Sequence, residues 1–239
     1  MMRESHSHSI CTYFLIIIVT MQYIHKKDII NPSYLSRLNK IVGGQNGFPW
    51  YFISEDISYD DATDMKFGDE EIRNKVPDKE RSIGFVHMLL DQGGVESPWL
   101  PHFLPLTDAI QDSIGHPVEF FRLRLALITD IGKNGHHNAP HTDHEEDHYA
   151  ALFYLHNSNG DTVFFDQYDD PKIGTVDERW WRARSQEYTI QKRVPPEANS
   201  LFVFDGHQFH ASSNPHGDCK YRVSLNLNFT SEHDLFADT

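Results

Sequence analysis

Apolar and polar positions follow different periods in the two halves of the chain. In the first half, apolar residues recur at helical spacing after Asn31-Pro32, which is typical of a helix that Gly43-Gly44 then terminates. Residues 99–114 predict a second helix, with Gly115 as its stop signal. In the second half, short runs of alternating or continuous apolar residues predict strands. We therefore expect helices early in the chain and a β-rich core after them.

Each predicted strand is a short apolar run, and turn residues separate one run from the next. They are residues 48–53, 83–90, 118–129, 149–156, 162–165, 188–194, 200–204 and 221–229. Asn159-Gly160 between two of these runs predicts a tight β-hairpin. A loop that carries Trp180-Trp181 is expected before the strand at 188–194. No internal repeat interrupts this order, so the sequence predicts a β-sandwich or jelly-roll core with N-terminal helical cover.

Two segments lie outside this pattern. Residues 10–24 are mostly apolar, but a membrane span requires about 20 such residues and this run is shorter and interrupted by polar ones. No small-residue cleavage site follows it. We therefore interpret residues 1–20 as an N-terminal extension or a buried strand, with a signal or anchor as the alternative. The charged residues 54–82 predict a surface loop, with a substrate lid as the alternative.

Composition narrows the class of partner. The chain has 35 acidic and 21 basic residues, and its formal net charge is −14. A surface of that sign repels phosphate backbones, so nucleic acid is not the expected partner. Cys11 and Cys219 are too few for a disulfide framework or a cysteine-rich zinc site. We expect a reducing, cytoplasmic setting and no stable membrane span.

Candidate metal ligands gather in the histidine-rich residues 136–144. There, His141 and Asp143 are separated by one residue, so an extended backbone places the imidazole and the carboxylate on the same side. A third candidate ligand, His210, lies much later in the chain. Two histidines and one carboxylate leave other coordination positions open, which suits non-haem Fe(II) and O₂ chemistry. In a chain with 16 histidines, a solvated polar loop is the alternative interpretation of the triplet alone.

The neighbouring histidines fit a second metal less well. His144 and His148 invite the hypothesis of a dinuclear zinc hydrolase, but that motif would require a histidine where Ala139 stands. His207 precedes His210 by three residues, so in an extended strand it would point to the opposite face.

The segments that follow the triplet resemble, in order, the prolyl-4-hydroxylase-like branch of the 2-oxoglutarate/Fe(II) oxygenase superfamily. The likeness is greatest to the small stand-alone members found in viruses and marine microbes. The segments that carry it are residues 149–155, 159–165, 200–206, 210–215 and 222–229. The resemblance extends over about residues 48–229. It implies a double-stranded β-helix, with residues 21–239 as one oxygenase domain and the catalytic core at about 117–230.

The resemblance also implies roles for single residues. The implied Fe(II) ligands are His141, Asp143 and His210. Arg222 stands where relatives place the basic residue that binds the distal carboxylate of 2-oxoglutarate, and a guanidinium can hold a carboxylate with two hydrogen bonds. Tyr154 matches a tyrosine that helps to hold the same carboxylate, and Ser224 would add a further hydrogen bond. A core aromatic and a plain strand residue are the alternative interpretations of these two.

The implied reaction is hydroxylation of a substrate with 2-oxoglutarate and O₂, and succinate and CO₂ are released. Residues 159–162 read Asn-Gly-Asp-Thr where many relatives read Gly-Gly-Glu-Thr, and Arg222 replaces the lysine of true prolyl 4-hydroxylases. The substrate therefore stays open between a prolyl or other peptide residue, an amino acid and a small metabolite. Arg122 and Arg124, which share one face of a predicted strand, are left outside the assigned site.

Two other functions compete with this hypothesis. A cupin-type metalloenzyme would use the same triad without 2-oxoglutarate, and it would not need Arg222 buried opposite the metal. A non-catalytic jelly-roll binding module would need neither the triad nor a buried Arg222, because its histidines would be incidental.

Overall fold

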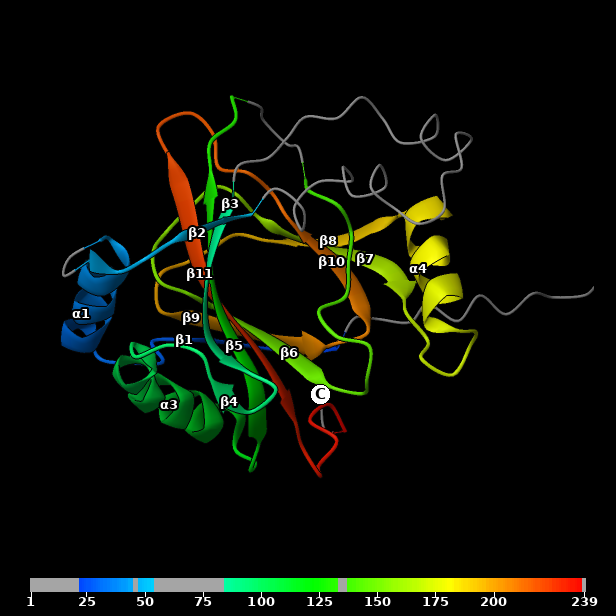
Figure 1. Ribbon diagram of the computed structural model, residues 1–239, viewed down its shortest axis with the longest axis horizontal. Helices are drawn as coiled ribbons and strands as arrows, with labels where there is room; N and C mark the ends of the chain where they lie inside the picture. Colours follow the sequence, from blue (N-terminus) through cyan, green and yellow to red (C-terminus); the bar gives the residue numbers. More distant parts are fainter. Residues whose placement is uncertain (1–21, 45–46, 54–83, 133–136, 238–239) are drawn as a thin grey trace, which may run out of the picture.

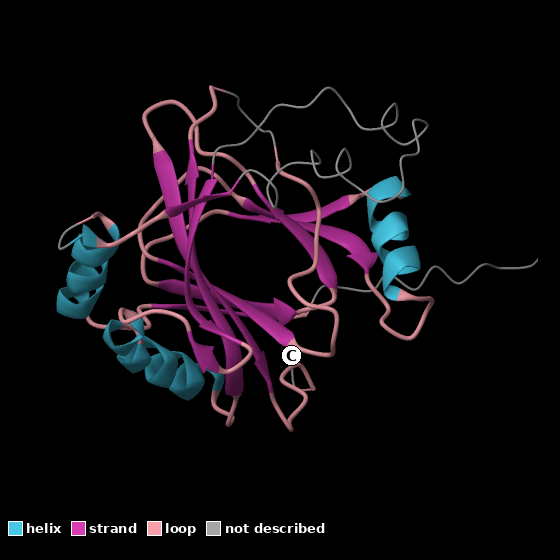
Figure 2. Cartoon of the chain, in the orientation of Figure 1, coloured by secondary structure: helices cyan, strands magenta, loops and turns pink. Residues whose placement is uncertain are grey.

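A computed structural model describes residues 22–44, 47–53, 84–132 and 137–237. Two antiparallel sheets make up its core, and helices lie on the outside of them (Figures 1 and 2). The larger sheet runs in the order β1 (Tyr23–Lys27), β9 (Ser200–Asp205), β6 (Tyr149–Tyr154), β11 (Tyr221–Thr230), β5 (Glu119–Thr129), β3 (Gly84–Asp91) and β2 (Tyr51–Ile53), with β4 (Gly94–Val95) paired to β3. The smaller sheet runs in the order β10 (Gln208–Ser212), β7 (Thr162–Tyr168) and β8 (Ile190–Val194). The predicted fold class, a mainly β jelly roll with N-terminal helices, is confirmed.

The two faces of the central strand β11 differ, since one is apolar and the other is polar. Its apolar residues Val223, Leu225 and Leu227 belong to the main hydrophobic core, which also contains Leu38 and Ile110 from the helices. Its alternate residues are polar and project from the other face of the sheet, because side chains alternate along a strand. These polar residues are Arg222, Ser224, Asn226 and Asn228. One face of the sheet therefore packs in the main core. The other face is polar along β11, beside a smaller apolar cluster that includes Leu152 and Phe202.

The two N-terminal helices cover the core face of the larger sheet (Figure 1). Helix α1 (Pro32–Val42) begins as predicted, since the Asn31 side chain accepts a hydrogen bond from the Tyr34 backbone. Helix α3 (Leu104–Ile114) ends at Gly115, whose φ of 87° is left-handed, as a helix stop requires. The single helix predicted at 99–114 is divided into a short 3₁₀ turn, η3 (Leu100–His102), and α3. Proline in the first turn of each explains the division, because proline cannot donate a backbone hydrogen bond inside a longer helix.

The predicted hairpin at Asn159-Gly160 is wrong. Strand β6 before this turn pairs with β9 and β11, whereas β7 after it pairs with β10 and β8, so the turn crosses from one sheet to the other. Asn159 instead exchanges hydrogen bonds with the backbone of His216. A Cβ atom on Gly160 would lie 2.5 Å from the carbonyl oxygen of Ser213. Glycine is needed here for close approach of two backbones, and not for a hairpin turn.

The predicted loop at Trp180-Trp181 is also wrong. These residues lie in helix α4 (Val176–Ser185), beside the smaller sheet (Figure 2). Thr175 and Glu178 form a capping box, in which each side chain binds the backbone N–H of the other residue. That Thr-x-x-Glu spacing is a helix-start signal that was present in the sequence.

Strands β1 and β10 were not predicted, because each is only five residues long and carries no strong alternation. The predicted extension at 1–20 and the predicted loop at 54–82 lie outside the described residues, so both stay predictions. Among the helices in the described part of the chain, none combines the length and apolar character that crossing a membrane requires.

Candidate active site

Backbone hydrogen bonds bring two distant histidines together. The His141 N–H donates to the His210 carbonyl oxygen over 2.9 Å, and the His210 N–H donates back over 3.0 Å. His210 lies in β10, while His141 lies in the loop between β5 and β6. Their ring centroids are 4.7 Å apart. The pairing of two short backbone segments therefore fixes the distance between the two imidazoles.

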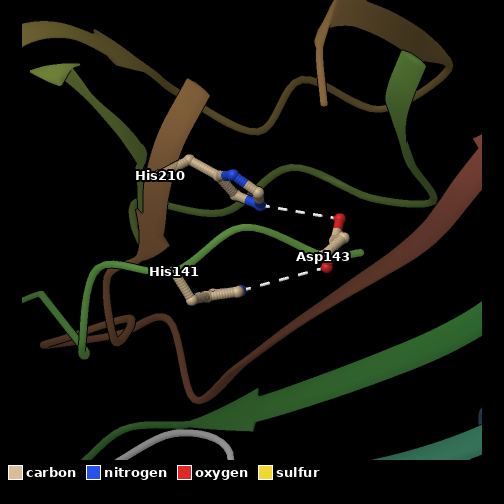
Figure 3. Close-up of side chains that lie close together, drawn as sticks. All are labelled: His141, Asp143 and His210. Carbon is tan, nitrogen blue, oxygen red and sulfur yellow. Dashed lines mark ion pairs between the residues drawn. The ribbon is translucent and has the colours of Figure 1, made fainter. Parts of the chain in front are cut away.

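Asp143 completes a group of three converging side chains (Figure 3). Its Oδ2 atom lies 3.6 Å from Nε2 of His210, and its Oδ1 atom lies 4.0 Å from Nε2 of His141. One ligand atom from each residue falls within 4.8 Å of the others. Such a separation suits a metal ion between them, because metal–nitrogen and metal–oxygen bonds are about 2.0–2.2 Å long.

The orientation of each ring leaves Nε2 available to a metal. Nδ1 of His141 lies 3.0 Å from the Ala139 carbonyl oxygen, and Nδ1 of His210 lies 3.1 Å from that of Gln208. A carbonyl only accepts hydrogen bonds, so these contacts place the proton on Nδ1 and the lone pair on Nε2. Nε2 of His210 is buried and has no hydrogen-bond partner among the described residues. A buried polar atom without a partner is costly, and a metal ion would satisfy it.

Surrounding groups keep the Asp143 carboxylate ionised. Burial alone would raise the pKa of Asp143, but the neighbouring side chains of His210, Arg124 and His141 hold that pKa well below its ordinary value. Asn228 donates a hydrogen bond to Oδ2 over 3.3 Å, and Arg122 donates to the backbone oxygen over 2.9 Å.

The protonation state of His210 follows from its burial. Burial lowers the pKa of His210 to about 4. At neutral pH the site therefore holds a carboxylate and a neutral His210 imidazole, which is the form that metal binding requires.

The triad opens on a cavity between the two sheets. The cavity volume is about 60 Å³. On that scale one water needs about 10–15 Å³, so a ligand of several heavy atoms fits. Its polar lining residues are Arg124, Asn138, His141, Thr162, His210, Ser212, Arg222, Ser224 and Asn226.

Arg222 is a buried cation in the wall of this cavity. The residue is 3% exposed. Its guanidinium donates to Oγ1 of Thr162 over 2.6 Å and to the carbonyl oxygen of Asp161 over 3.2 Å. No carboxylate within the described part of the chain lies within 4.0 Å of it, and the nearby Asp161 carboxylate faces Arg193 instead. Burial lowers the pKa of Arg222 below its ordinary value. An unpaired buried guanidinium of this kind suits an anionic ligand.

Solved structures share this architecture. The epimerase SnoN of nogalamycin biosynthesis, described as non-haem and α-ketoglutarate-dependent, superposes with a TM-score of 0.55 and 11% identity, over 88% of this chain and 79% of its own. A prolyl hydroxylase from Trichoplax adhaerens, solved with a peptide fragment of hypoxia inducible factor, superposes with a TM-score of 0.53 and 9% identity. The superposition covers 89% of this chain and 85% of the hydroxylase. An oxidoreductase of the 2OG-Fe(II) oxygenase family from Burkholderia pseudomallei superposes with a TM-score of 0.52 and 13% identity. The superposition covers 89% of this chain and 86% of the oxidoreductase.

The fold is the double-stranded β-helix of the 2-oxoglutarate/Fe(II) oxygenases. No protein-family model matches the sequence, and no curated protein is significantly similar to it. Identities of 9–13% with these structures establish a common fold and nothing finer.

The remaining predicted residues occupy different places in this β-helix. Ser224 lines the cavity, and its hydroxyl donates to Asn226 over 3.2 Å. Tyr154 is fully buried behind the cavity wall, and its hydroxyl hydrogen-bonds Thr162 over 2.8 Å. Tyr154 thus reaches the cavity through Thr162, which also accepts from Arg222.

Sequence reasoning missed Thr162 and Arg124 as cavity residues. Thr162 stood within the Asn-Gly-Asp-Thr quartet that carried the resemblance, so a signal for it existed. For Arg124 the only signal was its side of the strand, and that could not distinguish a cavity from solvent.

Two other histidines considered above, His148 and His207, lie outside the triad. His207 hydrogen-bonds Asp147 over 2.9 Å, and the His148 ring packs on Gly206. Within the described ranges, the triad is the one group of three or more histidine, cysteine or acidic side chains whose ligand atoms converge.

Proposed function

We propose that this chain is an Fe(II)- and 2-oxoglutarate-dependent dioxygenase that hydroxylates a substrate and releases succinate and CO₂. One observation carries the proposal. A buried guanidinium without a carboxylate partner, that of Arg222, lines the same cavity as the imidazoles of His141 and His210. A metal-binding end and an anion-binding end in one small cavity match a ligand that chelates a metal and carries a second carboxylate.

His141, Asp143 and His210 would hold the iron. Their donor set of two imidazoles and one carboxylate leaves coordination positions open, which is the pattern of non-haem Fe(II) oxygenases. When bound, the iron would supply activation of O₂ beside the oxo acid. The chain's own contribution is to fix the ligand atoms through backbone bonds to both rings, and to keep Asp143 ionised with Asn228 and two arginines.

Arg222 would bind the far carboxylate of 2-oxoglutarate, with Thr162 and Ser224 beside it in the cavity wall. Tyr154 would support this end indirectly through its hydrogen bond to Thr162. A carboxylate buried without a charge partner costs several kcal/mol, so the guanidinium gives the cavity its preference for a diacid.

Structures with the same fold support the choice of cofactors. SnoN has also been solved in complex with Fe³⁺, α-ketoglutarate and nogalamycin RO, and that structure superposes with a TM-score of 0.50 and 12% identity. We keep the substrate class open between a prolyl or other peptide residue, an amino acid and a small metabolite, since neighbours of this fold have been solved in complex with a peptide fragment and with nogalamycin RO.

Anaerobic titration with Fe(II), followed by 2-oxoglutarate, tests the proposal. We expect one metal site, and cosubstrate affinity that rises when the metal is present. Arg222→Gln should weaken 2-oxoglutarate binding by about 2–5 kcal/mol, the usual result of breaking a buried charge pair, while iron binding stays normal. His207→Ala is the matched control, because its ring binds Asp147 outside the triad.

The competing functions give different results in this experiment. Iron binding with no 2-oxoglutarate binding would indicate a cupin-type metalloenzyme, and absence of both would indicate a binding module. A mass-spectrometric search for products that gain one oxygen atom would then identify the substrate.

A further inference from the structure

Arg124 and Arg222 project from the same face of the larger sheet. Strands β5 and β11 are antiparallel neighbours, and their register places Arg222 opposite Ile128 and Asn226 opposite Arg124. Residues 222 and 226 share a face because side chains alternate along a strand, and directly paired residues share a face across strands. Both arginines line the cavity that contains the triad.

The backbone positions of the two arginines leave room for a short diacid between them. Their Cα atoms lie four residue positions apart along the sheet, which is roughly 13 Å at the usual rise of a strand. An extended five-carbon diacid spans about 5 Å between its carboxyl carbons. A carboxylate–guanidinium pair adds about 4 Å between carbons at each end. A diacid of that length therefore fits within the separation of the two backbone positions.

The two ends of the cavity differ in what they hold. Arg222 lies beside Thr162, and its backbone is four residue positions along the sheet from the level of Arg124. Arg124 lies at the other end, with Nη2 placed 3.7 Å from Oδ1 of Asp143. A carboxylate that binds a metal between His141, Asp143 and His210 would therefore lie next to the Arg124 guanidinium.

The balance of charge in the cavity also favours a ligand with two carboxylates. Asp143 is the one acidic side chain of the triad, and it would balance the charge of a bound divalent metal and of the Arg124 guanidinium together. Arg222 adds another positive charge to the same cavity. Positive charge then exceeds negative charge in a place with little water, and a dianionic ligand lowers this excess.

We infer that Arg124 is a second cosubstrate-binding residue, an inference that rests on the proposed function. It receives the carboxylate of 2-oxoglutarate that lies beside the metal, while Arg222 receives the distant one. Both ends of the cosubstrate are then held by arginine, and the metal is not the only group that fixes the reactive end.

A purely structural role for Arg124 would be to orient Asp143. Asp143 has two other contacts for that purpose, from Asn228 to its carboxylate and from Arg122 to its backbone oxygen. The two roles differ in a measurable way. An orienting residue affects metal affinity, whereas a cosubstrate residue affects oxo-acid affinity after the metal site is saturated.

Calorimetry on the full chain with saturating Mn(II) separates these roles, with two probes. 2-Oxoglutarate carries both carboxylates, and 2-oxopentanoate lacks the distant one. Arg222→Gln should weaken the binding of 2-oxoglutarate only. Arg124→Gln should weaken the binding of both oxo acids by the same factor, roughly tenfold or more, since each oxo acid retains the carboxylate beside the metal. Arg124→Lys, which keeps the positive charge, should recover part of that loss and shows that the site still folds.

Arg37→Gln, on helix α1 beside Tyr34, is the charge-matched control and should bind both acids as the parent does. Unchanged oxo-acid affinity in Arg124→Gln at saturating Mn(II) would overturn the inference and leave the proposed function intact. Failure of the parent to bind 2-oxoglutarate would contradict the proposed function itself.

Discussion

Nη2 of Arg222 lies 2.6 Å from Oγ1 of Thr162, the shortest of the hydrogen bonds that the Arg222 side chain makes within the described residues. The same oxygen is 2.8 Å from the Tyr154 hydroxyl. One small hydroxyl therefore connects the buried cation of the cavity to the aromatic core of the β-helix. Because all three groups are buried, removal of the middle one takes a buried hydrogen bond from each of the other two.

Thr162→Val should weaken 2-oxoglutarate binding and lower stability together. Valine has nearly the shape of threonine but no hydroxyl, so Arg222 and Tyr154 would each lose a hydrogen bond. A buried donor left unpaired costs about 1–3 kcal/mol. Thr162→Ser keeps the oxygen and should retain most of both properties. Calorimetry with 2-oxoglutarate and urea unfolding measure the two effects, and equal behaviour of the valine and serine variants would contradict the proposed role.

Substitution of a triad residue should remove the metal site and leave the fold intact. His141→Ala, Asp143→Ala and His210→Ala each delete one of three protein ligands, so Fe(II) or Mn(II) affinity should fall sharply in each. Far-UV circular dichroism should stay that of the parent, because the main core lies on the other face of the larger sheet.

The controls for the triad are His144→Ala and His207→Ala, which should bind metal nearly as the parent does. The assignment fails if His207 proves essential for metal binding while His141 does not.

Gly160→Ala should destabilise the protein through a steric clash. Its Cβ would lie 2.5 Å from the backbone oxygen of Ser213, and backbone atoms cannot move away cheaply. We expect a loss of about 1–3 kcal/mol in the free energy of unfolding, as for other overpacked sites. Gly217→Ala is the comparison, since it has a left-handed φ of 66° but open space around it. It should cost about 1 kcal/mol, so the larger loss belongs to position 160.

The metal-free protein should lose stability as the pH falls from about 6.5 toward 4. In the folded chain, burial lowers the pKa of His210 to about 4, whereas its ordinary value is 6.5. A group whose folded pKa is lowered stabilises the protein fully above its unfolded pKa, and this contribution disappears as the pH falls through the folded pKa. The change is about 3 kcal/mol at most.

Urea unfolding between pH 7 and pH 4.5 measures this effect. His210→Asn has no titrating ring at that position, so its stability should change less over the same interval. A parallel loss in parent and variant would exclude His210 as the cause.

Much of the fold could be predicted because it depends on local pattern. The polar positions of β11 alternate with apolar ones from Arg222 to Asn228, and that pattern alone indicated a strand with two different faces. The caps of α1 and α3 were visible in the same way, at Asn31 and Gly115. The Thr175–Glu178 capping box is an equally local signal for the start of α4.

What could not be predicted depends on partners distant in the sequence. Asn159-Gly160 has the composition of a hairpin turn, but its partners are residues of the 213–216 segment, which no local pattern reveals. Arg124 became a cavity residue only through the register of β5 against β11. The sequence alone indicates the three candidate ligands, but the orientation of the two histidine Nε2 atoms depends on the carbonyl contacts of both rings.

The two ends of the cavity are built on parts of the chain with different resistance to local opening. Arg222 belongs to a strand that has a hydrogen-bonded neighbour on each side, β5 and β6, and its apolar face is part of the main core. His141 is held by a single isolated pair of backbone bonds to His210. Amide hydrogens in β11 should therefore exchange with solvent only on global unfolding, whereas the His141 amide should exchange through a small and frequent opening. Metal release can then occur without disturbing the strand that carries the far arginine.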